Sequence, residues 1–155
     1  MIKLVGIELL ELQSSLKLGH DHRGVTAIFD PLRKSYVPAT PEETVRQLWI
    51  IYFLDVLLVR KKLMAVERSF QHHGQTRRFD LVVFGRTSTP LLLCEFKGPG
   101  IRITQSTFDQ IARYNMELQV PFSLVSNGSS HYCFQIDDEN KRFVWLDGLP
   151  FQSSG

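Results

Sequence analysis

RRFDLVVF at residues 77–84 and LLLCEFKGPG at residues 91–100 decide the fold of this chain. Each is a short run of aliphatic, aromatic and β-branched residues next to turn residues, which is the pattern of a buried β-strand. We therefore predict strands over 78–84 and 91–97, and a third strand over 64–70 (MAVERSF) that joins them in an antiparallel meander. The GPG at the end of the second stretch is a strong turn signal and ends its strand.

A helix is predicted on each side of this meander along the chain. The first begins at Thr40, a good N-cap residue that is followed by proline at the first helical position and by two glutamates in the first turn. Its apolar residues recur at helical spacing to about Val59. The second helix is predicted over 104–118. The residues expected to form its buried stripe are Phe108, Ile111, Ala112 and Met116.

The remaining strands complete a mixed α/β fold. Three are predicted after the second helix, over 122–126, 132–136 and 143–146, and two before the first helix, over 25–29 and 35–37. This order of elements predicts a mixed central β-sheet flanked by helices. We expect a single domain over residues 1–155, with an N-terminal arm over 1–39 and the sheet-forming core over 40–148.

The composition is that of an ordinary globular protein. Of 155 residues, 43% are hydrophobic and 22% are charged, which excludes a disordered, collagen-like or coiled-coil chain. The net charge of +2 does not by itself indicate a nucleic-acid-binding protein, so such a partner must be argued from a local site. Two cysteines do not make a disulfide framework. The most apolar stretch, residues 48–59, contains Asp55 and is shorter than the roughly 20 residues that span a bilayer, so we expect a cytoplasmic protein with no membrane partner.

Two carboxylates and a lysine lie within the two central strands or at their ends: Asp80, Glu95 and Lys97. Side chains alternate along a strand, so Glu95 and Lys97 point to one face and Phe96 to the other. If the strands pair, Asp80 lies beside Glu95, and two neighbouring carboxylates make an oxygen site that suits Mg²⁺ or Mn²⁺. An adjacent lysine stabilises developing negative charge or helps to deprotonate a water molecule. The alternative is structural: carboxylates at the end of a sheet, with Lys97 in a cross-strand salt bridge.

Other polar residues near these strands have two interpretations each. Glu67 in the first strand either joins the site or pairs with Arg78 on the neighbouring strand. The basic clusters at 60–62 and 77–78 are either solvated edges or contacts for nucleic-acid phosphates. His131 begins a strand beside two serines, and we expect it at the surface.

An aspartate followed by Glu-x-Lys, after a capped helix that begins with glutamates, resembles the PD-(D/E)xK nuclease superfamily. In detail the chain is similar to the N-terminal domain of the type I restriction enzyme R subunit, small stand-alone members included. The resemblance covers about residues 28–146 and implies a restriction-endonuclease-like fold. The segments that carry it are IFDPLRKSYV (28–37), TPEETVRQ (40–47), RRFDLVVF (77–84), LLLCEFKGPG (91–100), TQSTFDQIARYN (104–115) and VSNGSSHYC (125–133).

The resemblance implies a role for each matching residue of the site. Asp80 and Glu95 would bind the divalent metal ion, and Lys97 would be the catalytic lysine. The first-helix glutamate of the superfamily falls on Glu42 or Glu43. Glu42 is preferred as a further metal ligand, because its spacing puts it on the inward face of the helix, whereas Glu43 has the spacing of a capping box.

The resemblance also extends to the second helix. Gln110 and Tyr114 match the Q-x-x-x-Y element of the restriction and recombination nucleases. At i and i+4 they share a helix face, from which they would reach the active site or the DNA backbone. Their alternative role is a polar cap over the sheet.

The function that the resemblance implies is a Mg²⁺-dependent DNA endonuclease, with Mn²⁺ as a substitute. The alternative is a catalytically silent DNA-binding or assembly module of the same fold that acts with a partner subunit. The expected partners are DNA and a motor or specificity subunit, because the sequence has no Walker-type phosphate loop of its own. The DNA substrate, the number of metal ions and the oligomeric state, a homodimer included, stay open.

Overall fold

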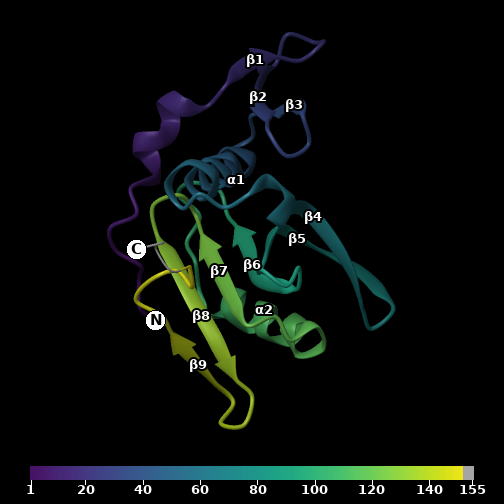
Figure 1. Ribbon diagram of the computed structural model, residues 1–155, viewed down its shortest axis with the longest axis vertical. Helices are drawn as coiled ribbons and strands as arrows, with labels where there is room; N and C mark the ends of the chain where they lie inside the picture. Colours follow the sequence, from purple (N-terminus) through teal and green to yellow (C-terminus); the bar gives the residue numbers. More distant parts are fainter. Residues whose placement is uncertain (152–155) are drawn as a thin grey trace.

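The computed structural model describes residues 1–151, without the side chains of Phe70 and His72. The chain forms a six-stranded mixed sheet, a separate three-stranded sheet and helices around them (Figure 1), which confirms the predicted α/β class. The end of the predicted domain, residues 152–155, lies outside the described part. In chain order the elements are η1 (Leu9–Ser15), β1 (Leu18–His20), β2 (Thr26–Asp30), β3 (Ser35–Pro38), α1 (Pro41–Ile51), η2 (Tyr52–Val56), η3 (Lys61–Leu63), β4 (Met64–His72), β5 (Gln75–Phe84), β6 (Pro90–Phe96), α2 (Gln105–Leu118), β7 (Phe122–Ser126), β8 (His131–Asp137) and β9 (Arg142–Trp145).

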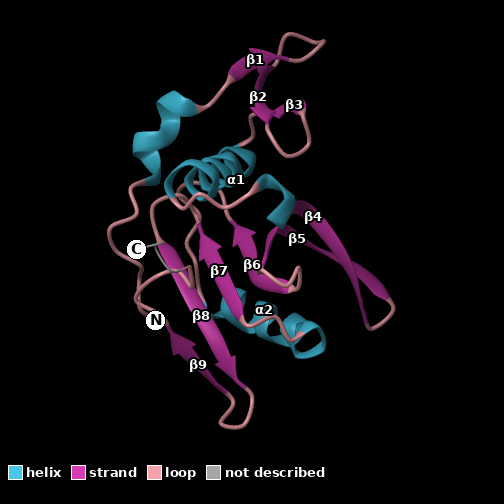
Figure 2. Cartoon of the chain, viewed as in Figure 1, coloured by secondary structure: helices cyan, strands magenta, loops and turns pink. Residues whose placement is uncertain are grey.

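The large sheet follows the chain order from β4 to β9 (Figure 2). Its strands are antiparallel neighbours except for β6 and β7, which are parallel and are joined through α2. A parallel pair needs a crossover of this kind, because a tight turn reverses the chain direction. The parallel pair therefore places the end of β6, which carries Glu95 and is followed directly by Lys97, in the middle of the sheet.

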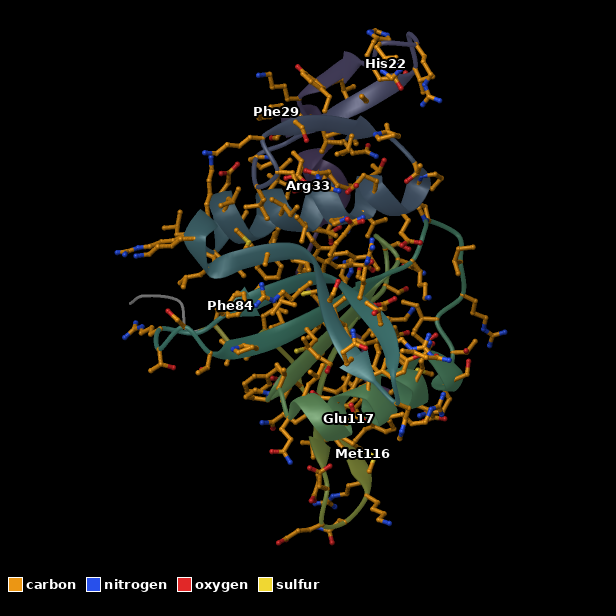
Figure 3. All side chains as sticks on the ribbon, turned by 90° about the vertical axis from the view of Figure 1, so that its right-hand side faces the viewer. His22, Phe29, Arg33, Phe84, Met116 and Glu117 are labelled. Carbon is orange, nitrogen blue, oxygen red and sulfur yellow. The ribbon has the colours of Figure 1, made fainter. Side chains whose placement is uncertain are left out.

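The two α-helices cover opposite faces of the large sheet (Figure 3). On one face Trp49 of α1 and Phe53 of η2 pack in a cluster with Leu81 and Phe96, and the rings of Trp49 and Phe96 are stacked at 6.4 Å. On the other face the apolar side of α2 packs on the sheet in two smaller clusters. The sheet is thus buried on both sides, which explains why its central strands read as nearly continuous apolar runs.

The first helix begins as its sequence predicts. Thr40 is the N-cap, and its Oγ1 accepts a hydrogen bond from the backbone amide of Glu43 at 3.1 Å. The α-helix ends at Ile51 and continues as the π-helical turn η2 to Val56, so helical structure stops short of the predicted Val59. No helix among residues 1–151 is long and apolar enough to span a membrane.

The second helix corrects one prediction about the core. Phe108 and Ile111 are buried as expected, but Met116, labelled in Figure 3, is 69% exposed. The last turn of α2 buries Asn115 instead, whose side-chain amide donates to the carbonyl of Val120 and accepts from its backbone amide, both at 2.8 Å. The buried residues Phe108, Ile111 and Asn115 are spaced i, i+3 and i+7, and Met116, one position further, points about 100° away from this face.

The small sheet lies beyond α1, away from the large sheet (Figure 1). Its strands are antiparallel in the order β1–β2–β3, and the predicted pairing across Asp30-Pro31 is confirmed. The strand β1 and the 3-10 helix η1 were not predicted. Both precede the first turn signal of the arm, and a strand of three residues is too short to show an alternating pattern.

Strands β4 and β5 extend past the rest of the sheet as a two-stranded arm (Figure 1). They pair with each other from Met64–Val83 to His72–Gln75, but the register of β5 with β6 covers only Leu81 to Phe84 of β5. Residues 68–79 therefore form a hairpin arm, in which the register pairs each strand only with the other strand of the hairpin. The arm contains three arginines and no aspartate or glutamate.

Candidate active site

Asp80 and Glu95 lie side by side at the point where the arm leaves the sheet. The pair Leu81–Cys94 belongs to the β5–β6 register, and the next position of that register places Asp80 beside Glu95. The Oδ2 atom of Asp80 accepts a hydrogen bond from the backbone amide of Phe96 at 2.6 Å. The Asp80 carboxylate takes the place of a backbone carbonyl as the acceptor for this strand amide. The hydrogen bond restricts the movement of the side chain and holds Asp80 against the strand that carries Glu95.

The backbone changes its regular course at Asp80. Phe79 packs in the cluster with Val82, on the α2 side, whereas Leu81 packs on the α1 side. Regular alternation would put Phe79 and Leu81 on the same face. Opposite Asp80 in the β4–β5 register stands Glu67, a non-glycine residue with a φ of 53°. This conformation costs about 1–2 kcal/mol, and such strain concentrates at functional sites.

The two carboxyl groups are hard to ionise together. Burial raises the pKa of Asp80 to about 6, although the Phe96 amide, Arg46 and Lys97 act in the opposite direction. Burial, and then the charge of Asp80, raise the pKa of Glu95 to about 8. Two buried carboxylates this close repel each other, so both ionise readily only when a cation joins them.

Lys97, two residues after Glu95, is the positively charged side chain that the sequence predicts for this site. Its positive charge lowers the pKa of both Asp80 and Glu95, and its backbone amide donates to the carbonyl of Ser126 on β7 at 2.8 Å. Phe96 between the two charged residues is buried in the α1 cluster, and Glu95 lines a pocket beside α2. The predicted alternation of Glu95 and Phe96 is therefore confirmed.

The structure separates the two glutamates at the start of α1. Glu42 is exposed, and its charge raises the pKa of both Asp80 and Glu95. Its backbone nitrogen is close to Gly98, where an added Cβ atom would lie 3.9 Å from it. Glu43 is buried and bonded to arginines: its Oε1 to Arg33 at 2.6 Å and its Oε2 to Arg46 at 2.8 Å. The prediction that Glu42 lies on the inward face of α1 is therefore wrong, because Glu43 is the buried glutamate; Glu42 acts on the acidic pair through its charge alone.

Arg46 connects α1 to the site, and the sequence analysis did not single it out. Its Nε donates to Glu43, its Nη1 donates to the backbone carbonyl of Asp80 at 3.1 Å, and its Nη2 lies 3.8 Å from Glu67. Arg46 is therefore the partner beside Glu67, for which the sequence had suggested the site itself or Arg78. Its role rests on a contact 34 residues away along the chain, which no local pattern signals.

The same network continues into the small sheet through Arg33, labelled in Figure 3. Arg33 bridges Glu43 and Asp30, with its Nε 2.7 Å from Oδ2 of Asp30. Gln47 donates to that oxygen at 2.9 Å. Burial would raise the pKa of Asp30, but hydrogen bonds from Arg33, Gln47 and Leu32 outweigh it and hold the pKa below its ordinary value. This buried carboxylate is therefore ionised and fully paired.

Gln110 and Tyr114 lie over the α2 side of the site. Gln110 Nε2 donates to the Tyr114 hydroxyl at 2.9 Å, as expected for an i, i+4 pair on one helix face. Both line a pocket of about 260 Å³ to which Glu95 also contributes. They thus lie next to the acidic pair.

The donor set fits a hard cation with few protein ligands. Among the side chains that the structure describes, which leave out that of His72, no three His, Cys, Asp or Glu residues form a group that could hold a metal ion. Asp80 and Glu95 remain as a pair, with Glu42 acting at longer range. Mg²⁺ is commonly bound through one or two carboxylates and keeps several water ligands, so two adjacent carboxylates that repel each other are suited to it.

His131 corrects another prediction. It was expected at the surface, but it is 2% exposed. Its ring packs edge-on against Trp49 at 5.1 Å, and its Nδ1 lies 2.7 Å from the hydroxyl of Ser126. Burial lowers the pKa of His131. The N-terminal segment makes the difference, because Leu4 bonds to the backbone carbonyl of His131 from a part of the chain far away in sequence.

The profile of one family, described as the type I restriction enzyme R protein N terminus, matches residues 41–150. The chain belongs to this family. The match begins at α1 and includes the acidic pair, Lys97 and the α2 pair Gln110–Tyr114, whereas η1, the small sheet and Arg33 precede it. Membership in this R-protein family connects the chain to restriction systems. No curated protein gave a significant match to the chain.

The raised pKa values predict how the stability of this R-protein-family chain depends on pH. Without metal, the folded protein keeps protons on Asp80 and Glu95 that the unfolded chain has already released above about pH 4.5. The contribution of these two groups to the free energy of unfolding is therefore fully present below their unfolded pKa values. It is lost as the pH rises through about 8. We expect the free energy of unfolding of the Glu95→Gln variant at pH 8 to exceed that of the wild type by on the order of 2 kcal/mol.

Chemical denaturation in EDTA at pH 5 and pH 8 measures this difference. His131 acts in the opposite direction, because its pKa is lowered in the folded state, so the comparison is made between wild type and variant at each pH. At pH 5 the two proteins should have nearly equal stability. A difference that is the same at both pH values would contradict the prediction.

Proposed function

We propose that this chain is a Mg²⁺-dependent nuclease domain that hydrolyses DNA phosphodiester bonds. The observation that carries the proposal is the half-buried pair Asp80–Glu95, adjacent in the β5–β6 register and beside Lys97, with pKa values raised to about 6 and about 8. Membership in a restriction-enzyme family supports DNA as the substrate. Strongly perturbed carboxyl groups that have a specific charged neighbour are typical of catalytic sites.

In this proposal Asp80 and Glu95 hold the metal ion, and Glu42 adds negative charge at the start of α1. The chemistry that Mg²⁺ supplies at such a site is Lewis-acid polarisation of a phosphoryl oxygen and activation of a water molecule. Lys97 stabilises the negative charge that develops on the phosphate and orients the water. Arg46 holds Asp80 through its carbonyl, so that its carboxylate stays against β6.

Cleavage of DNA by the purified chain tests the proposal. We expect supercoiled plasmid to be nicked or linearised in the presence of Mg²⁺ or Mn²⁺, and the reaction to stop when EDTA is added. Plasmid and linear duplex are compared, because a domain without its own target recognition should cut both. A folded protein that leaves both DNAs intact with either metal would overturn the proposal.

A second candidate is a DNA-binding or assembly module of the same family that does not cleave. It is favoured by the exposure of Glu42 and by the small number of carboxylates, two, that lie together at the site. Salt-dependent DNA binding without metal-dependent cleavage would select this candidate, since phosphate contacts make affinity fall with salt.

A further inference from the structure

The structure distinguishes the two basic clusters that the sequence contains. Arg77 and Arg78 line the pocket that also contains Glu95. Arg60 and Lys62 line a different hollow beside Phe84, the last residue of β5. Only the first cluster is therefore placed to contact a substrate that reaches Glu95.

The pocket beside Glu95 is formed between β5 and α2. Its side chains are of the types that make phosphate contacts in protein–DNA complexes, where arginine, threonine, glutamine and tyrosine donate to phosphate oxygens. The residues that line it are Thr76, Arg77, Arg78, Phe79, Glu95, Thr107, Gln110, Ile111 and Tyr114.

Arg77 is held in place within this pocket. Its guanidinium group lies over the ring of Tyr114, 5.4 Å from the ring centroid, and one Nη donates to the side chain of Gln75. Its Nε has no hydrogen-bond partner among the residues that the structure describes. A planar guanidinium that stacks on an aromatic ring loses little conformational entropy when it binds an anion. The ring contact and the Gln75 bond therefore hold this cation at the pocket, whereas its Nε is itself buried.

The charge distribution favours a polyanion as the ligand. The hairpin arm over residues 68–79, which extends past the rest of the sheet (Figure 1), carries three arginines and no carboxylate, and all three arginines lie in the part of the arm nearest the sheet. A cluster of positive charge with an aromatic ring beside it is a common arrangement in proteins that bind nucleic-acid strands. A single small anion would need the pocket but not the arm.

We propose that the pocket between β5 and α2 is a phosphate-binding subsite for DNA, in which Arg77, held over Tyr114, binds a backbone phosphate neighbouring the one at Asp80 and Glu95. The proposal rests on the proposed function, because it takes the acidic pair as the cleavage point. In it Tyr114 is a positioning residue that acts through Arg77, and the Gln110 amide fixes the orientation of the Tyr114 hydroxyl. The arm then guides the strand away from the site.

DNA binding without metal tests the subsite. Fluorescence anisotropy of a fluorescein-labelled oligonucleotide, single-stranded and as a duplex, is measured in EDTA for the full chain, so that no cleavage occurs. We expect Arg77→Gln to weaken binding about tenfold and to reduce the slope of log K against log salt by about one, as the loss of one phosphate contact does. The matched control is Arg86→Gln, an exposed arginine beyond the far end of β5, which should change the affinity less than about twofold.

Tyr114 supplies a second readout that a purely structural role would not give. Tyr114→Leu should weaken DNA binding, and Tyr114→Phe, which keeps the ring, should restore most of the affinity. In a double-mutant cycle the Arg77→Gln and Tyr114→Leu effects should not add, because both act through the same contact. Thermal unfolding of each variant identifies any loss of fold.

The outcomes separate the two proposals. An Arg77→Gln affinity equal to that of wild type, or equal to that of Arg86→Gln, would overturn the subsite whether or not the chain cleaves DNA. A chain that binds DNA through Arg77 but does not cleave it would overturn the nuclease proposal and leave the subsite in place.

Discussion

Replacing Asp80 with asparagine is expected to lower the DNA-cleavage rate by at least about 10²–10³-fold, the range seen when one preorganised electrostatic group is removed from an active site. Asparagine is nearly isosteric, and its side-chain oxygen can still accept the hydrogen bond that the Phe96 amide donates to Asp80. The junction of β5 and β6 should therefore persist. In the proposed site, what is lost is one of the two charges that would attract the metal ion.

The same substitution should make the metal-free protein at least as stable as the wild type. The charge of Asp80 is a principal cause of the raised pKa of Glu95, second only to burial, so its removal relieves repulsion at pH 8. Loss of activity together with an unchanged or increased free energy of unfolding would exclude misfolding as the cause. Chemical denaturation in EDTA, calorimetric titration with Mn²⁺ and a plasmid-cleavage time course measure the three effects.

The expected pattern is weaker Mn²⁺ binding, cleavage lost, and DNA binding in EDTA retained. Lys97→Met provides the matched comparison, because it should also reduce cleavage but leave Mn²⁺ binding intact. Cleavage by Asp80→Asn within about tenfold of wild type would mean that the acidic pair does not carry the reaction. Equal Mn²⁺ affinities for Asp80→Asn and wild type would contradict its role as a ligand.

The sheet could be predicted from sequence because its strands are buried on both faces. RRFDLVVF and LLLCEFK each contain an uninterrupted apolar run next to turn residues, and β7 was predicted with the bounds that the structure has, Phe122–Ser126. Elements outside the large sheet were harder. The three residues of β1 pair with β2 at the edge of the small sheet and show no apolar alternation of their own.

The neighbourhood of Asp80 and Glu95 followed from strand register, but the distinction between Glu42 and Glu43 did not. Both glutamates occupy the first turn of α1, and the spacing to the N-cap fits Glu43. What separates them is Arg33, which reaches Glu43 from the small sheet. A contact between such distant segments cannot be predicted from the local spacing of residues. His131 is a parallel case, because the segment that covers it lies at the other end of the chain.

Replacing Arg46 with methionine is expected to lower the free energy of unfolding by about 3–5 kcal/mol, the cost of removing one partner from a buried ion pair. Arg46 is 8% exposed and Glu43 is 7% exposed. Without Arg46, the Oε2 atom of Glu43 loses its closest cation at 2.8 Å, and the carbonyl of Asp80 loses the Nη1 donor at 3.1 Å. Methionine fills similar space but supplies no donor.

The matched control is Arg23→Met, which removes an arginine from an exposed ion pair with Asp21. The Arg23 side chain is 64% exposed, and exposed pairs of this kind contribute about 0–1 kcal/mol. Both variants are measured by urea denaturation in EDTA at neutral pH. A loss for Arg46→Met as small as that for Arg23→Met would show that the network is not important for stability.

A double variant separates the cost of an unpaired charge from the value of the ion pair. In Glu43→Leu/Arg46→Met both charged partners are replaced by apolar residues, which for buried pairs is often neutral or stabilising. The Asp80 carbonyl still lacks its donor, and Arg33 keeps Asp30 as a partner. We therefore expect the double variant to be more stable than Arg46→Met alone but less stable than the wild type. If it regains full stability, the bond from Arg46 to the Asp80 carbonyl contributes little, and the acidic pair owes its position to the β5–β6 register alone.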